Sequence, residues 1–300
     1  LQLGTGVAVP GLRLAPVAAN GIATINRLAP GRCFMGLGTG NTAMRMLGHP
    51  PAKVAEFKEY IRVVSALLRG EEVEFTIDGV THPITFANQD FGYINVTDPI
   101  PVHVGGFGPR AQALAGELGD GLITGIPRGG SITRALANVR RGAERAGRSL
   151  DDFKTYALVN LLMLEPGETL ESERAIAEIG SGIMVNVHYL VERWKETGED
   201  PPDYVKPIWK DYLAFLEERD GVRQHQEMHK SHYSYLDPKE ARFITPEMIR
   251  TFSVAGQPEE IVEQLREYER QGLDGINFIP TLDQQYRLIE DFARKVISRM

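Results

Sequence analysis

The chain has 300 residues, of which 42% are hydrophobic and 24% charged, so it can bury a substantial core and is neither disordered nor fibrous. Its formal net charge of −7 argues against a nucleic-acid partner, because phosphate binding needs clustered cations. A single cysteine, Cys33, excludes an internal disulfide, and no apolar run approaches the roughly 18 residues of a membrane span. These features predict a cytoplasmic globular protein that binds neither membranes nor nucleic acid.

Strand-like and helix-like segments alternate from the start of the chain. The run "LQLGTGVAV" precedes an amphipathic helix predicted at 15–29, and "RCFMGLG" at 32–38 supplies the next strand. Residues 51–70 place apolar side chains on one helical face, with prolines at the start and Gly70 at the end. This order indicates a strand, helix, strand unit followed by a second helix.

A peripheral insertion is predicted at 71–98. Within it, residues 72–86 alternate around Asp78-Gly79, a dipeptide that suits a two-residue turn with positive φ angles. The pattern predicts a β-hairpin.

The second half of the chain contains a helical insertion or lid, predicted at 168–250, before the last strand. Strands that are repeatedly followed by helices imply a parallel sheet with right-handed crossovers. Such a sheet is either doubly wound or an eight-stranded barrel that lacks its first two strand-helix units, and the start inside a strand-like run favours the barrel. Six core strands are predicted, at residues 1–7, 32–38, 101–106, 120–125, 153–164 and 274–280.

Glycine-rich turns end three of these strands, at 3–7, 36–41 and 104–109. Parallel strands bring such turns to one face, where ligands of α/β folds bind. A dinucleotide fingerprint at 36–41 is disfavoured, because the acidic residue nearest the required spacing, Glu56, lies within a helix. The turns therefore predict a ligand site of another kind.

The third turn, "GGFGPR", leads directly into a helix. Free backbone N–H groups at a helix start favour an anion, most often a phosphate. Gly106, Phe107, Gly108 and Arg110 are therefore predicted to form a phosphate cradle.

Other polar candidates have simpler explanations. The arginine-rich stretch 140–148 is interpreted as a solvated helix face. His225, His229 and His232 include a pair at metal-ligand spacing, but Glu227 lies one residue beyond the metalloprotease position, so no metal is predicted. His188 and Tyr189 lie on an apolar helical stretch, either in the core or, alternatively, in a substrate pocket.

At the level of family, the chain resembles the bacterial luciferase-like monooxygenases, which include flavin- and coenzyme F420-dependent oxidoreductases. The matching pieces include "AANGIATINRLAPGRCFMGLGTGN", "PVHVGGFGPRAQALAGELGDGLITG" and "AGQPEEIVEQLREYERQGLDGINFIP". The resemblance implies a single (β/α)8 TIM-barrel domain over 1–300 that aligns from the family's third strand. It also implies a homodimer.

The same resemblance implies a cofactor site at the carboxyl ends of the strands. It makes Gly6-Val7 the candidate for a non-proline cis peptide, in a bulge behind the isoalloxazine ring of the cofactor. No catalytic residue is assigned, because the family's first two strands, which commonly carry it, have no counterpart here. The implied cofactor-binding residues are Gly6, Val7, Gly38, Thr39, Gly40, Asn41, Gly105, Gly106, Phe107, Gly108, Pro109, Arg110, Thr124 and Gly125.

The identity of the cofactor depends on Asn41, which follows the glycine turn where deazaflavin relatives often carry an acidic residue. That difference favours reduced FMN, and hence a monooxygenase that uses O2 on a small organic substrate with a separate flavin reductase as partner. The alternatives are a coenzyme F420-dependent reductase or dehydrogenase that transfers hydride, and a non-catalytic flavin-binding protein.

Overall fold

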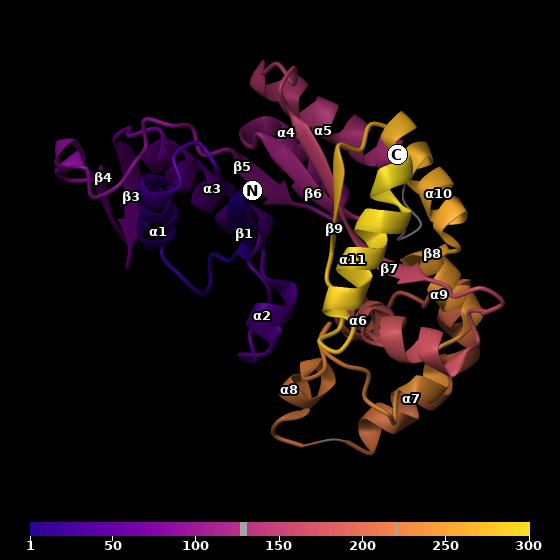
Figure 1. Ribbon diagram of the computed structural model, residues 1–300. Coiled ribbons are helices and arrows are strands. Elements are labelled where there is room, and N and C mark those ends of the chain that lie inside the picture. The colour runs from indigo at the N-terminus through magenta and orange to yellow at the C-terminus, as the bar shows by residue number, and fades with distance from the viewer. Residues whose placement is uncertain (127–130, 220) are drawn as a thin grey trace. The chain divides into compact units, whose positions relative to one another are not determined.

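The computed structural model describes residues 1–126, 131–219 and 221–300 (Figure 1). The chain forms two compact units. The N-terminal unit comprises Leu1–Thr124 and Thr133–Tyr156, and the C-terminal unit comprises Gly125–Ile132 and Ala157–Met300.

The N-terminal unit contains a parallel sheet whose neighbouring strands are, in order, β1 (Leu3–Ala8), β2 (Cys33–Leu37), β5 (Val102–Gly105) and β6 (Gly121–Gly125). These strands confirm the first four that the sequence predicts, and their parallel pairing confirms the expected α/β fold. Four carboxyl ends therefore share one edge of the sheet.

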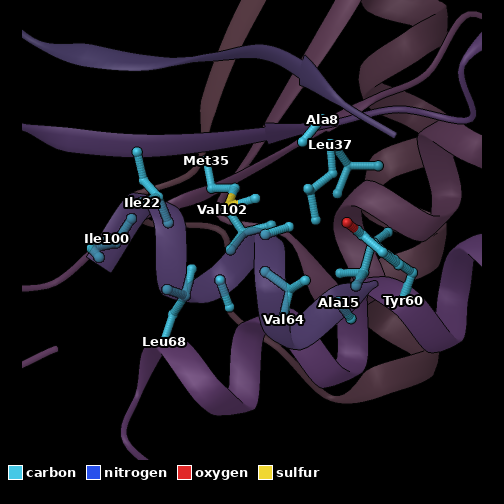
Figure 2. Packing of buried hydrophobic residues seen from close by; sticks show 14 of the residues in the cluster. Ala8, Ala15, Ile22, Met35, Leu37, Tyr60, Val64, Leu68, Ile100 and Val102 are labelled. Carbon is cyan, nitrogen blue, oxygen red and sulfur yellow. The ribbon is translucent and has the colours of Figure 1, made fainter. Parts of the chain in front are cut away.

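Helices cover one face of this sheet. Residues Met35 of β2 and Val102 of β5 are almost completely buried, and Figure 2 shows them packed toward Ile22 and Val64 on the helices. The helices that supply this core are α1 (Ala15–Leu28), α3 (Val54–Leu68), α4 (Pro109–Leu118) and α5 (Ile132–Ala146).

The opposite face carries a row of rings that lie over glycines. The Phe34 and His103 rings stack with their centroids 5.1 Å apart, and the Tyr156 ring lies 5.2 Å from that of His103. A Cβ atom on Gly4 would lie 2.4 Å from the Phe34 ring, and one on Gly121 would lie 2.8 Å from His103 Cδ2. Burial lowers the pKa of His103, which favours the neutral form of its ring.

A hairpin and two short helical segments also belong to this unit. The predicted hairpin is confirmed as β3 (Val73–Ile77) and β4 (Val80–Ile84), with positive φ angles at both turn residues. A short helix, α2 (Asn41–Arg45), follows β2 and was not predicted, and a 3-10 turn spans Gln89–Phe91.

In the C-terminal unit, β8 (Ser253–Gly256) runs parallel to β7 (Lys154–Met163), and β9 (Gly275–Phe278) also pairs with β7. The sequence predicted one strand after the insertion, and this was wrong, since both β8 and β9 follow it. Strand β8 was missed because it has only four residues and starts directly after a helix. The region predicted as helical is indeed mainly helical. The helices of this unit are α6 (Glu173–Thr197), α7 (Lys206–Glu217), α8 (Gln224–His229), α9 (Pro246–Phe252), α10 (Pro258–Arg270) and α11 (Gln285–Lys295).

Two glycines set the distance between α4 and α5. A Cβ atom on Gly142 would lie 1.8 Å from the Ala113 carbonyl oxygen, and one on Gly116 would lie 1.9 Å from that of Val139. We therefore expect Gly142→Ala to destabilise the protein by about 2–4 kcal/mol, because the two backbones must separate.

Urea unfolding followed by circular dichroism measures this loss. The matched control is Gly21→Ala in α1, where nothing lies within 4 Å of the added Cβ and the helix gains up to about 1 kcal/mol. Equal stability of the two variants would contradict the close crossing.

Candidate functional site

The candidate site lies where β1, β2 and β5 of the N-terminal unit end. The peptide bond Gly6-Val7 near the end of β1 is cis, as the sequence comparison with the family led us to expect. The pairing of β1 with β2 shifts between Thr5 and Ala8, which confirms the predicted bulge. The bulge places Val7, a 36% exposed apolar residue, at the edge of the sheet.

The three chain segments at this edge are in direct contact. A Cβ atom on Gly105 would lie 3.0 Å from the Leu37 carbonyl oxygen, 3.5 Å from Gly38 Cα and 3.8 Å from Val7 Cγ1. The turns that the sequence predicts to converge do so within this one unit.

The glycines after β2 serve the packing of the chain itself. A Cβ atom on Gly38 would lie 2.6 Å from Val7 Cγ2, and one on Gly40 would lie 2.1 Å from Val9 Cγ1. Gly40 also has a φ of 80°, which an L side chain rarely adopts. Gly38 and Gly40 leave room for the side chains of Val7 and Val9 in the β1 segment. The presence of glycine at these two positions therefore does not by itself indicate that a cofactor ring binds beside them.

Thr39 and Asn41 are half-buried and engaged locally. The Thr39 carbonyl oxygen accepts a hydrogen bond from Ala52 N at 3.0 Å. Asn41 Oδ1 accepts one from Arg45 Nε at 2.6 Å, within α2. The Asn41 side chain thus stabilises a short helix.

The start of α4 has the features of an anion site. Its N-cap residue, Gly108, supplies no side-chain acceptor, and Pro109 occupies the first turn. A Cβ atom on Gly108 would meet nothing within 4 Å, whereas one on Gly106 would lie 3.0 Å from backbone atoms of Ala111. Gly106 is therefore packed closely against the helix, whereas the space next to Gly108 is open to a ligand. The exposed Arg110 adds a positive charge to this helix start.

A buried amide network that the sequence analysis missed lies beneath this turn. Asn138 Nδ2 on α5 donates a hydrogen bond of 2.6 Å to Gln112 Oε1 on α4. Gln112 Nε2 in turn lies 3.5 Å from the Gly106 and Phe107 carbonyl oxygens and from Thr124 Oγ1. Amide side chains among alanines on two apolar helix faces are the sequence signal that could have revealed it.

Residues 1–275 match the family of luciferase-like monooxygenases. The chain belongs to this family. An F420-dependent glucose-6-phosphate dehydrogenase of Nakamurella multipartita is 27% identical over 99% of this chain and 77% of its own length. A 5,10-methylenetetrahydromethanopterin reductase of Archaeoglobus fulgidus is 26% identical over 91% of this chain and 75% of its own length.

Solved structures of luciferase-like proteins share the fold. The coenzyme F420-dependent tetrahydromethanopterin reductase from Methanopyrus kandleri superposes with a TM-score of 0.64 at 21% identity, covering all of this chain and 83% of its own. Monooxygenases are among the other structures of this fold. The protein is thus a luciferase-like oxidoreductase with an α/β fold of TIM-barrel type.

None of the helices in its described parts is long and apolar enough to cross a membrane.

His188 and Tyr189, the predicted substrate residues, lie in the C-terminal unit. His188 is fully buried, with Nε2 3.1 Å from Glu240 Oε1. Tyr212 Oη donates a 2.8 Å hydrogen bond to the same carboxylate oxygen. These contacts give His188 a place in the core, and a substrate role for Tyr189, which is half-buried, remains a prediction.

The histidines of the helical region follow the same pattern. His229 is buried, with Nε2 2.6 Å from Glu192 Oε1, so this pair joins α8 to α6. Across residues 1–126, 131–219 and 221–300, no three metal-ligating side chains gather around one point.

The amide network beneath the α4 turn is testable by a double-mutant cycle. Gln112→Leu should destabilise the protein by about 1–3 kcal/mol, because the buried Asn138 amide loses its acceptor. Chemical denaturation would measure the loss. Adding Asn138→Leu removes the unpaired donor as well, and we expect the double variant to recover part of the stability. Strictly additive losses would show that the two amides do not interact.

Proposed function

We propose that the protein is a coenzyme F420-dependent oxidoreductase that transfers hydride between the deazaflavin and a small organic substrate. The observation that carries this proposal is the match, over 99% of the chain, to a dehydrogenase that uses this coenzyme. We propose this function in place of the FMN-dependent monooxygenase that the sequence favoured on the basis of Asn41. The Asn41 side chain accepts a hydrogen bond from Arg45 within α2, so its identity has a local structural explanation.

The residues of the N-terminal unit fit a cofactor with a 5′-phosphate. The open position at Gly108 and the uncapped start of α4 leave room and backbone donors for a negatively charged phosphate group. Arg110 adds a cation in the same helical turn, and the Gln112 amide supports the preceding backbone from beneath.

The end of β1 has open space for the ring of the cofactor. A Cβ atom on Gly6 would meet nothing within 4 Å, and the neighbouring Val7 exposes part of its apolar side chain. We assign this pair to contact with one face of the ring, where an apolar wall excludes water. The close contacts of Val7 with Gly38 and Gly105 hold that wall in place.

When bound, the deazaflavin supplies a carbon that accepts or donates hydride, and it does not activate O2. The residues described here bind and orient the cofactor. Thr124 lies near the end of β6, and its Oγ1 atom lies 3.5 Å from Gln112 Nε2. We assign Thr124 to the support of the phosphate turn.

Cofactor choice is decided by titrating the protein with reduced F420 and reduced FMN in parallel and following fluorescence. We expect the deazaflavin to bind at least about tenfold more tightly, and substrate turnover to proceed anaerobically. Preferential FMN binding together with substrate-dependent O2 consumption would instead support the monooxygenase, with its separate flavin reductase.

The position of the phosphate is tested with a pair of variants at one residue. Gly108→Asp should weaken cofactor binding about tenfold or more, since a carboxylate then faces the phosphate. Gly108→Ala should bind nearly as the wild type, because the space in front of Gly108 is open. Unchanged affinity in the aspartate variant would show that the phosphate binds elsewhere.

A further inference from the structure

A groove on the outer surface of the N-terminal unit begins at the first turn of α4. It lies along α4 between α3 and α5 and has a volume of about 370 Å³, within the range of ligand pockets. Ala113 and Leu114 contribute apolar surface to it, while Lys58, Arg110, Arg141 and Arg145 contribute positive charge.

The charge of this groove contrasts with that of the whole protein. Four cations line it against one carboxylate, Glu117, although the chain has a net charge of −7. Lys58 Nζ lies 2.5 Å from Glu117 Oε1, so these two charges offset each other. Within the described chain, Arg110 and Arg145 form no hydrogen bond or ion pair, and both are exposed.

The groove is continuous with the proposed phosphate turn. Pro109 and Arg110 line the groove and also form the first turn of α4. Arg141 joins it to the buried network, because its guanidinium donates a hydrogen bond to Asn138 Oδ1. The close crossing of α4 and α5 at Gly116 and Gly142 brings the α5 arginines beside α4.

We propose that this groove binds the carboxylate-bearing tail of coenzyme F420. The inference rests on the proposed function. In that coenzyme the phosphate is not terminal: it continues into a lactyl group and a chain of γ-linked glutamates, whereas FMN ends at its phosphate. A phosphate at Gly108 would place the start of such a chain beside Arg110, and Arg141 and Arg145 contribute charge to the same groove.

The experiment compares three probes on the whole protein: F420 with several glutamates, the same deazaflavin as its tail-free 5′-phosphate, and FMN. Dissociation constants are measured by fluorescence at low and high salt. We expect the tail to tighten binding severalfold at low salt, and the gain to shrink at high salt because exposed charges are screened.

Arg145→Gln tests the groove at a residue of α5, whereas the phosphate turn belongs to the start of α4. It should weaken binding of the tailed coenzyme about two- to fivefold and leave the tail-free phosphate unchanged. Arg140→Gln is the matched control, since Arg140 is exposed on the same helix and does not line the groove. It should change neither affinity.

The outcomes separate the two proposals. Equal affinity for the tailed and tail-free deazaflavins, or an equal effect of Arg145→Gln on both, would overturn the tail groove and leave the F420 assignment standing. Binding of FMN with no binding of either deazaflavin would overturn the proposed function itself. A tail-dependent gain that Arg145→Gln removes and Arg140→Gln retains would support the groove.

Discussion

The candidate site depends on the close approach of β1 to β2 at glycines. A Cβ atom on Gly36 would lie 2.1 Å from the Thr5 carbonyl oxygen, and that approach also allows Thr5 Oγ1 to donate a 2.8 Å hydrogen bond to the Gly36 carbonyl. The same closeness recurs two residues later, where Gly38 makes room for Val7. Any side chain at these positions would push β1 away and open the wall against which we place the cofactor.

Glycine spacing therefore has two meanings in this chain that the sequence alone does not separate. Gly38 and Gly40 are required by contacts within the protein, whereas Gly6 and Gly108 face open space. The latter two have no packing reason in the described structure to lack a Cβ, which is why a ligand is the better explanation for them. The convergence of the turns was predictable from the sequence. Which glycines are required by packing and which face open space was not.

Local pattern was sufficient for much of the fold. Parallel strands, the hairpin turn at Asp78-Gly79 and the helix at 54–68 all follow from residue period and turn chemistry. The amide pair Gln112 and Asn138 was not predicted, because it joins two helices and depends on their crossing. Strand β8 was missed because four residues between two helices are too few to show a period.

The choice of cofactor shows how little a single position decides when its structural role is unknown. Asn41 suggested FMN by its difference from an acidic residue, yet its side chain accepts a hydrogen bond within α2. Beyond the phosphate turn, the two cofactors differ in charge as well as in ring chemistry, because only one continues into a polycarboxylate. A protein of net charge −7 repels such a chain over most of its surface, so a local excess of cations along α4 is where that repulsion reverses. The arginines at 141 and 145, which the sequence presented as part of a solvated helix face, line the same groove as Arg110, and we assign them to that charge.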